Sequence, residues 1–290
     1  MKALWDVPAP AKLNLFLHVV GRRADGYHLL QSPFVLIDWC DTLHFEVRAD
    51  GLLQRHDLGE PLPQDDLCLR AARLLQRESG CSKGADISVL KRLPSGAGLG
   101  GGSSDAATTL LALNRLWGLR WPRTQLLALG LQLGADVPFF VGGHNAFVEG
   151  IGERLTPIEV PPQCFAVVKP PAAIPTKSIF ESPLLVRDTE PVIVAGSLAA
   201  PAWASGRNDL QPPAEAQEPE VKVVAEWLEK RFGNSRMTGS GSAVFARAGE
   251  IRDGTSAPPT ATWQAEDLLP GWVARMCRSL AHHPLVEWAS

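Results

Sequence analysis

The sequence predicts an α+β protein made of two units, and three observations support this class. The chain has 290 residues, which is enough for two ordinary domains. Strand-like segments dominate the N-terminal part, and strand-like and helix-like segments are mixed afterwards. A boundary falls within residues 156–162. We therefore predict an N-terminal domain at residues 1–158 and a C-terminal domain at residues 159–290.

Six apolar segments predict strands, because β-branched and apolar side chains suit a pleated, buried surface. They are residues 13–20, 34–37, 42–47, 87–93, 167–169 and 243–246. The segment at 167–169 ends before Pro170, which cannot continue a ladder of hydrogen bonds.

Four segments have apolar residues at the spacing of one helix face, and they predict helices. They are residues 68–76, 105–116, 124–133 and 221–231. Loops and turns are predicted where charged, polar, glycine-rich or proline-rich residues cluster. These are residues 21–26, 199–219, 237–241 and 249–262.

The composition, with 45% hydrophobic and 20% charged residues, is typical of a soluble globular protein. A net charge of −3 gives no reason to expect nucleic acid or an anionic membrane as a partner. The five cysteines are scattered and form no C-x-x-C pair, which disfavours a disulfide framework or a zinc site. Neither a signal peptide nor an apolar run of membrane-spanning length is found. We expect a cytoplasmic protein, whose oligomeric state the sequence leaves open.

Residues 94–104 have the sequence P-S-G-A-G-L-G-G-G-S-S, between a predicted strand and a predicted helix. Glycines allow backbone N–H groups to approach an anion closely, and a helix N-terminus adds partial positive charge there. A simple tight turn is the alternative, but it needs neither five glycines nor two hydroxyls. The run therefore predicts a phosphate-binding loop. Ser103 and Ser104 cap its helix, contact a phosphate or its magnesium ion, or do both.

Two other phosphate-binding motifs fit this run less well. Gly96, Gly98 and Gly101 formally satisfy G-x-G-x-x-G, the fingerprint of a Rossmann nucleotide-binding oxidoreductase. That fold has its motif in the first strand–helix unit and an acidic residue about 20 positions later, and neither is found here. A Walker loop is excluded because no G-K-[ST] follows.

Lys12 and Asn14 lie at the start of an apolar predicted strand, two positions apart and therefore on the same face. A lysine there reaches either solvent or a partner inside the protein. Asp136 lies in an apolar segment, where a buried carboxylate needs a cation or hydrogen-bond donors, although a turn or helix-cap aspartate is the common alternative. We predict that these two residues form a catalytic pair, in which Asp136 accepts the proton of an alcohol and Lys12 polarises its hydroxyl.

Three segments resemble the motifs of the GHMP kinases, the superfamily of galactokinase and the homoserine, mevalonate and phosphomevalonate kinases. They are A-P-A-K-L-N-L at 9–15, L-P-S-G-A-G-L-G-G-G-S-S-D-A-A at 93–107 and M-T-G-S-G-S-A at 237–243. The resemblance implies an N-terminal domain of mixed sheet and helices, a ferredoxin-like C-terminal domain and an active site in the cleft between them. It also implies ATP and Mg²⁺ as cofactors, with Ser104 as a metal ligand. The ATP-binding residues implied are Pro94, Ser95, Gly96, Ala97, Gly98, Leu99, Gly100, Gly101, Gly102, Ser103 and Ser104.

Further segments resemble one branch of this superfamily, the kinases of 4-diphosphocytidyl-2-C-methyl-D-erythritol. They are G-R-R-A-D-G-Y-H at 21–28, D-V-P-F-F at 136–140, I-P-T-K-S-I-F at 174–180 and R-N-D-L at 207–210. An aromatic ring followed by an imidazole suits stacking on a base and hydrogen bonding to its edge, although an ordinary D-G-Y-H turn is the alternative. Lys177, Ser95 and Ala97 depart from the usual pattern without removing a chemical group. The substrate-binding residues implied are Asn14, Tyr27, His28, Thr176, Phe180, Gly239 and Ser240.

The resemblance implies a kinase that transfers the γ-phosphoryl group of ATP to the 2-hydroxyl of that alcohol, in non-mevalonate isoprenoid biosynthesis. A kinase of homoserine, mevalonate or a sugar is the alternative within the superfamily. Those substrates have no cytosine to explain Tyr27, His28 and Phe180. The oxidoreductase is the alternative outside the superfamily. The expected partners are therefore two small molecules, ATP and the cytidine substrate.

Overall fold

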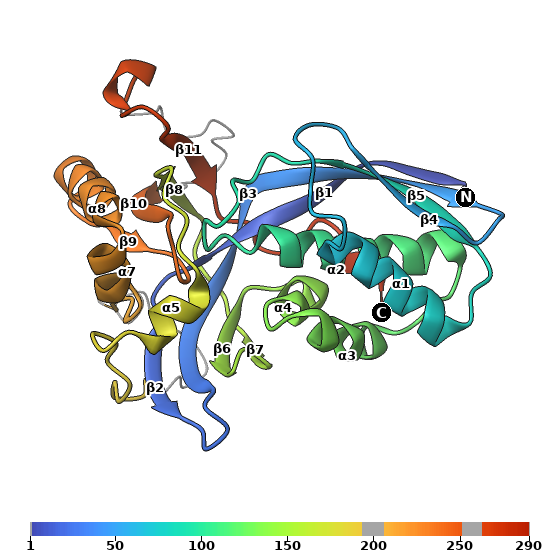
Figure 1. Cartoon of the computed structure of the whole chain (residues 1–290), viewed down its shortest axis with the longest axis horizontal. Helices are drawn as coiled ribbons and strands as arrows, with labels where there is room; N and C mark the ends of the chain where they lie inside the picture. The colour runs from blue at the N-terminus through green and yellow to red at the C-terminus, as the bar shows by residue number, and fades with distance from the viewer. Residues whose placement is uncertain (1, 193–205, 251–262, 290) are drawn as a thin grey trace.

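The computed structural model describes residues 2–192, 206–250 and 263–289. Two sheets with their helices lie next to each other along the longest axis of the molecule (Figure 1). Antiparallel pairing dominates both sheets, so the predicted α+β class is confirmed and a doubly wound parallel sheet is excluded. Within these residues, no helix combines the length and the apolar content that a bilayer crossing requires.

The larger sheet is organised around β3, a single strand of 21 residues. This strand pairs antiparallel with β1, β2, β5 and β6. At the edges, β4 pairs parallel with β5, and β7 pairs antiparallel with β6. The strands are β1 (Ala3–Asn14), β2 (His18–Arg22), β3 (His28–Arg48), β4 (Leu53–Asp57), β5 (Gly84–Leu90), β6 (Ala146–Gly150) and β7 (Arg154–Pro157).

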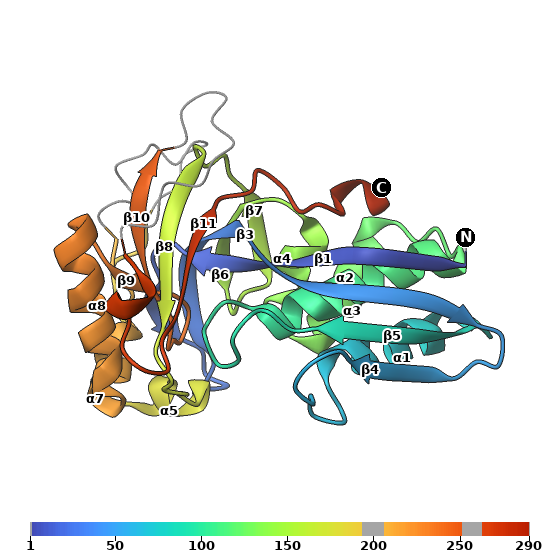
Figure 2. The ribbon, with the colours of Figure 1, turned by 90° about the horizontal axis from the view of Figure 1, so that it is seen from above.

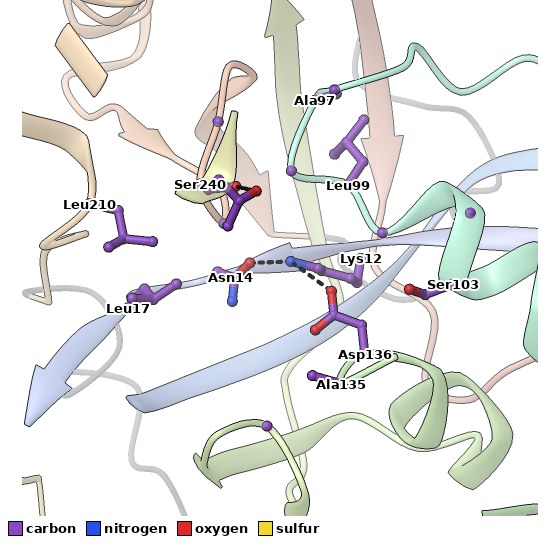
Figure 3. A pocket seen from close by; sticks show the side chains of 18 of the residues that line it. Lys12, Asn14, Leu17, Ala97, Leu99, Ser103, Ala135, Asp136, Leu210 and Ser240 are labelled. Atoms are coloured by element: carbon purple, nitrogen blue, oxygen red, sulfur yellow. Dashed lines mark hydrogen bonds and ion pairs between the residues drawn. The ribbon is translucent and has the colours of Figure 1, made fainter. Parts of the chain in front are cut away.

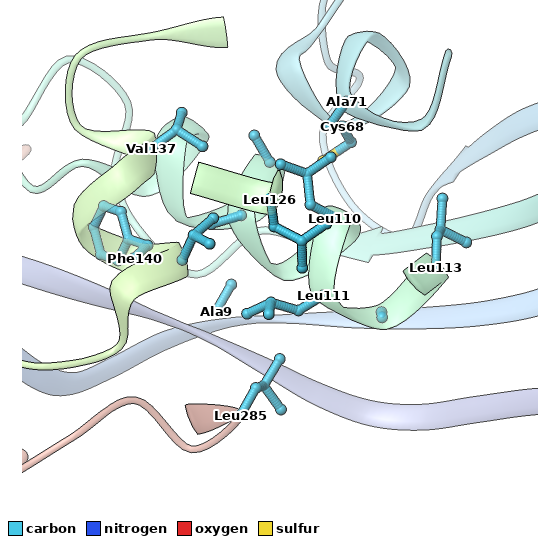
Figure 4. Close-up of a cluster of buried hydrophobic side chains, with 14 of the residues drawn as sticks. Ala9, Cys68, Ala71, Leu110, Leu111, Leu113, Leu126, Val137, Phe140 and Leu285 are labelled. Carbon is cyan, nitrogen blue, oxygen red and sulfur yellow. The ribbon is translucent and has the colours of Figure 1, made fainter. Parts of the chain in front are cut away.

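Four helices cover one face of this sheet (Figures 1 and 2). They are α1 (Leu67–Ser79), α2 (Gly101–Trp117), α3 (Arg123–Leu133) and α4 (Val137–Gly142). Helix α2 is central, because it packs against the other three helices and against β1. Its side chains are buried on nearly all sides, and the buried set includes the polar residues Thr108, Thr109 and Asn114. Leu110 and Leu111 lie in the resulting core with Ala9 and Phe140 (Figure 4).

The smaller sheet has the strand order β11-β8-β10-β9, and all its pairs are antiparallel. Helices α7 and α8 pack together along one side of it (Figure 2), whereas α5 lies at one end. The elements are β8 (Gln163–Lys169), α5 (Thr176–Glu181), α7 (Gln211–Gln217), α8 (Pro219–Phe232), β9 (Arg236–Met237), β10 (Val244–Glu250), η1 (Ala265–Asp267) and β11 (Val273–Arg278). The last element, η2 (Val286–Trp288), packs against α2 of the larger unit.

The two units share buried contacts. Phe165 of the smaller sheet lies in one apolar cluster with Leu13 of the larger sheet. After β11 the chain returns to the first unit, where Ser279 forms a bridge with Ile37 and Leu285 joins the core over the larger sheet. The two units are therefore joined by a buried apolar interface. The domain boundary at 158/159 stays a prediction.

Two strand predictions are wrong in their bounds. The segment 13–20 is not one strand, because β1 ends at Asn14 and Leu17 forms a bridge with Asn208 of the smaller unit. The segments 34–37 and 42–47 are parts of one strand, since β1 pairs alongside both with an irregularity after Pro10. A tertiary partner thus decides where these strands break.

The predicted loops also differ from the structure. Residues 21 and 22 belong to β2, and the segment 199–219 contains α7 and the first residue of α8. Residues 199–205 and 251–262 of the predicted loops lie outside the described residues. Strands β4, β6, β7, β9 and β11 were not predicted. Strands β4, β7 and β11 are edge strands with mostly half-buried or exposed side chains and a weak apolar pattern, and β9 has only two residues. Strand β6 is a buried strand inside the larger sheet, but it is only five residues long.

Candidate active site

A cavity of about 1250 Å³ lies where the two units meet. Residues from the end of β1, the glycine loop, the start of α4, α5 and the turn before β10 line it, and Figure 3 shows them from close by. Of the predicted site residues, only Ser104 is not on this wall. The cavity brings together Lys12, Asn14, Tyr27, His28, Pro94, Ser95, Gly96, Ala97, Gly98, Leu99, Gly100, Gly101, Gly102, Ser103, Asp136, Thr176, Phe180, Gly239 and Ser240.

Lys12 and Asp136 face each other in the cavity (Figure 3). The Lys12 Nζ lies 3.8 Å from Asp136 Oδ2 and donates a hydrogen bond to Asn14 Oδ1. The side chain of Lys12 is 4% exposed, whereas that of Asp136 is 31% exposed. Burial lowers the pKa of Lys12, and the neighbouring Asp136 acts in the opposite direction. The pair therefore places one ammonium and one accessible carboxylate within reach of a bound molecule.

Backbone structure fixes the position of this pair. The N–H of Lys12 donates to the carbonyl of Leu99 at 3.0 Å, which joins the end of β1 to the glycine loop. The Lys12 ammonium also lies 4.8 Å from the ring centre of Phe34, a favourable cation–π position. Asp136 directly precedes α4, but its side chain makes no cap hydrogen bond. The side chain of Asp136 therefore does not cap the helix, and it is available to the cavity.

The glycine loop has the backbone of an anion-binding turn. Gly96, Gly98 and Gly100 have φ values of 61°, 70° and 73°, which favour glycine. Helix α2 begins at Gly101 with no side-chain cap, so the N–H groups of its first turn are not bonded by a capping side chain. A Cβ on Gly98 would lie 2.1 Å from the carbonyl oxygen of Thr238. The loop can therefore accept an anion and also pack tightly against the turn at 238–241.

That turn belongs to the smaller unit and is bonded directly to the larger one. The N–H of Asn14 donates to Thr238 Oγ1 at 3.0 Å, and the N–H of Ser242 donates to the carbonyl of Gly96 at 3.0 Å. The hydroxyls of Ser240 and Thr176 are 2.9 Å apart. Residues widely separated in the sequence thus form one continuous wall.

Asn208 is a site residue that sequence reasoning missed. It is 3% exposed, and its Nδ2 donates to the carbonyls of Met237 and Gly239 at 2.7 and 2.8 Å. Its Oδ1 accepts from the N–H of Leu210 at 2.9 Å. The R-N-D-L segment was the available signal, because a buried asparagine needs several backbone partners. Asn208 does not line the cavity, so it positions the turn at 238–241.

Lys91 and Asp105 also line the cavity and were missed. The Lys91 Nζ donates to Asp105 Oδ2 at 2.6 Å and to the fully buried Asp41. Asp41 in turn accepts from the N–H groups of Arg92 and Leu93 at 2.6 and 2.8 Å. Burial raises the pKa of Asp105 above its ordinary value, and the neighbouring Lys91 acts in the opposite direction. This cluster fixes the start of the glycine loop relative to β3.

Ser103, and not Ser104, faces the cavity. Ser104 is fully buried, and its Oγ has no hydrogen-bond partner. Consecutive residues of a helix point in directions about 100° apart, and here one of the two neighbouring serines lies on the cavity wall while the other points into the core. In the part of the chain that the structure describes, no cluster of three or more His, Cys, Asp or Glu is arranged for a metal. The hydroxyl of Ser103 is of the kind that Mg²⁺ accepts alongside phosphate oxygens and water.

Another part of the cavity wall is aromatic. The rings of His28 and Phe180 stack with centroids 5.0 Å apart and planes at 28°. Tyr27 is 61% exposed beside them. A further part of the wall consists of Leu62, Pro63, Asp66 and Leu67 before and at the start of α1, which the sequence did not indicate. With a volume of about 1250 Å³, the cavity therefore has room for two ligands that meet at the Lys12–Asp136 pair.

Comparison with known proteins gives a consistent family. Residues 66–144 match the profile described as the GHMP kinases N terminal domain, and residues 195–256 match that of the GHMP kinases C terminal domain. The chain is 66% identical to the 4-diphosphocytidyl-2-C-methyl-D-erythritol kinase of Methylibium petroleiphilum, over 100% of this chain and 99% of that protein. It is 55% identical to the kinase of the same name from Verminephrobacter eiseniae, over 100% of this chain and 99% of that protein.

Solved structures agree with this placement. A crystal structure of 4-(cytidine 5'-diphospho)-2C-methyl-D-erythritol kinase matches with a TM-score of 0.75 and 35% identity, covering 94% of this chain and 98% of that one. The homoserine kinase of Cytophaga hutchinsonii, at 16% identity and a TM-score of 0.65 over 98% and 96% of the two chains, shares the fold. This chain belongs to the 4-diphosphocytidyl-2-C-methyl-D-erythritol kinase family of the GHMP kinases.

Proposed function

We propose that this chain transfers the γ-phosphoryl group of ATP to the 2-hydroxyl of 4-diphosphocytidyl-2-C-methyl-D-erythritol, in non-mevalonate isoprenoid biosynthesis. The Lys12–Asp136 pair beside the glycine loop is the observation that supports it most strongly, because phosphoryl transfer to an alcohol needs a proton acceptor next to a phosphate site. The full-length identity with kinases of that substrate supports the choice of alcohol.

ATP binds along the glycine loop in this proposal. The positive-φ glycines and the uncapped start of α2 hold its phosphates, since both present N–H groups to an anion. The apolar surface of Leu62, Pro63 and Leu67 is the adjacent place for the adenine ring. Mg²⁺ would neutralise phosphate charge when bound, and the hydroxyl of Ser103 would help to hold it, together with phosphate oxygens and water.

The chemistry depends on position and charge. Asp136 accepts the proton of the 2-hydroxyl as the oxygen attacks the γ-phosphorus. The buried Lys12 ammonium stabilises negative charge on that oxygen, and it does so effectively because little water screens it. Asn14 holds the Lys12 ammonium in place by accepting its hydrogen bond.

The cytidine part of the substrate binds at the aromatic end. Phe180 and Tyr27 offer faces for stacking on the base, and His28 offers a hydrogen bond to its edge. Thr176 and Ser240 are hydroxyl donors for the oxygens between base and alcohol. This division places recognition and chemistry at opposite ends of one cavity.

A phosphorylation assay with ATP and each candidate alcohol tests the proposal. We expect turnover with 4-diphosphocytidyl-2-C-methyl-D-erythritol and phosphorus NMR that places the new phosphate on the 2-hydroxyl. Homoserine, mevalonate and galactose should give at least about 100-fold lower kcat/KM, since they leave the aromatic end unfilled. Preference for one of these three, or a product phosphorylated elsewhere, would overturn the assignment.

A further inference from the structure

Arg187 lies on the cavity wall beside the two rings assigned to the cytidine base, and no sequence motif indicated it. Its Nε donates to His28 Nε2 at 3.2 Å. Its Nη2 donates to the carbonyls of Phe180 and Ser182, each at 2.9 Å, and its Nη1 donates to the carbonyl of Leu185 at 3.0 Å. One guanidinium therefore joins the start of β3 to the end of α5.

The contact with His28 selects one state of the imidazole. A guanidinium has only donors and stays protonated at every working pH. The Nε2 atom of His28 must therefore accept, which leaves the ring neutral with its proton on Nδ1. Protonated His28 would place an N–H group against the N–H group of Arg187.

The same guanidinium also holds Phe180. The carbonyls at a helix C-terminus lack partners within the helix, and a cation placed there is favourable. Arg187 satisfies the carbonyls of Phe180 and Ser182, at and just beyond the end of α5. The ring of Phe180 consequently stays stacked on His28, with centroids 5.0 Å apart.

We propose that Arg187 is a positioning residue for the cytidine base, because it holds His28 as the neutral Nδ1–H tautomer and Phe180 against it. This inference rests on the proposed function, which supplies the base as the ligand. In that tautomer His28 offers one free donor and no free acceptor. Cytosine presents the ring nitrogen N3 and the oxygen O2 as acceptors, so the selected state of His28 complements its edge.

The surrounding charges favour the same neutral state. Burial lowers the pKa of His28, and the positive charges of Arg187 and Arg22 lower it further. The other charged or titratable side chains on this part of the wall are Asp25, Tyr27, Lys177 and Glu181. Removal of Arg187 should raise the pKa of His28 towards its ordinary value. The KM for the cytidine substrate should then begin to rise at a higher pH as the solution is acidified.

Histidine NMR on the free, full-length protein tests the tautomer directly. Long-range ¹H–¹⁵N spectra of ¹⁵N-histidine-labelled protein, with His28 assigned from the His28→Gln variant, should show Nδ1 protonated and Nε2 unprotonated at neutral pH. Arg187→Met should populate the Nε2–H tautomer. Arg22→Met is the matched control, since Arg22 also faces His28 but donates to the carbonyl of Gly26 at 3.1 Å. It should leave the tautomer unchanged.

Steady-state kinetics test the consequence for the base. Arg187→Met should raise the KM for the cytidine substrate about tenfold, with kcat and the KM for ATP within about twofold. Arg187→Lys keeps a charged donor and should recover part of that loss. A wild-type spectrum with Nε2 protonated overturns the inference, as does a normal KM in Arg187→Met. If wild-type protein does not phosphorylate the cytidine substrate, the proposed function fails, whereas the tautomer is still decided by the spectra.

Discussion

The two ends of the cavity are built in different ways. At the phosphate end, the backbone of the glycine loop lies against the backbone at Thr238, and Lys12 is 4% exposed between them. At the base end, side chains make the contacts, and Tyr27 is 61% exposed. The residues assigned to phosphoryl transfer are thus held by closely packed backbone, because that reaction depends on exact position. The residues assigned to binding the cytidine base are side chains of a turn and a short helix. Substitutions at the first end should lower kcat, and those at the second should raise KM.

The largest effect is expected for Asp136→Asn. The amide cannot accept the proton of the alcohol, so kcat should fall at least about 100-fold, while the KM for each substrate changes little. Steady-state kinetics with both substrates measure this. The melting temperature is the control and should stay near that of the wild type, because the carboxylate is partly exposed. A near-normal kcat would refute the role of Asp136 as proton acceptor. It would also remove the distinction between a catalytic end and a binding end of the cavity.

Gly98→Ala tests whether the packed backbone matters for catalysis. The new Cβ would lie 2.1 Å from the carbonyl oxygen of Thr238, so the loop or the turn has to shift. We expect kcat/KM to fall roughly 30-fold, since displacements of about 1 Å are costly for phosphoryl transfer.

Gly233→Ala is the matched control for this change. Gly233 has a similar φ of 68°, but no atom lies within 4 Å of its new Cβ. The control should lose about 1 kcal/mol of stability, measured by urea unfolding, and keep its activity. Equal activity losses in both variants would mean that backbone strain alone explains the effect.

Phe180→Leu tests the base end. Loss of stacking on a base should raise the KM for the cytidine substrate about tenfold and leave kcat within about twofold. Phe232→Leu is the control, because Phe232 packs on Trp263 away from the cavity. An effect on kcat alone would contradict the separation between recognition and chemistry.

Asn208→Ala should have the smallest effect, because Asn208 acts through the turn and touches no ligand. Loss of its bonds to Met237 and Gly239 should lower kcat/KM about fivefold. Asn234→Ala removes similar bonds, to the carbonyls of Phe232 and Arg247, far from the cavity. It should lower the melting temperature to a similar degree but leave kcat/KM unchanged, and a parallel loss of activity would exclude a positioning role for Asn208.

Much of the fold and the candidate site was predictable from short segments. Helices α1, α2, α3 and α8 agree with their predicted segments to within a few residues, because apolar spacing and cap residues are local properties. The edge strands were not predictable, since pairing with a neighbour and not apolar burial stabilises them, and the buried β6 was missed because a run of five residues is a weak signal. The same distinction holds within the site.

By itself, the sequence determined which groups are available for chemistry and the order in which they occur. Lys12, Asp136, the glycine loop and the pair Tyr27–His28 all lie within short segments whose residue types limit what they can do. These are local facts, because the type of a residue determines which titratable groups, donors and acceptors it has and how freely its backbone can turn.

Tertiary structure alone decided which of these groups meet. It turned Ser103 towards the cavity and buried Ser104, it set Gly98 against Thr238, and it brought Arg187 to His28. Each of these outcomes depends on a helix phase or on contact between segments far apart in the chain. The contacts of Gly98 with Thr238 and of Arg187 with His28 join distant segments, so they form only in the folded protein. The spacing of residues along the chain therefore cannot predict them.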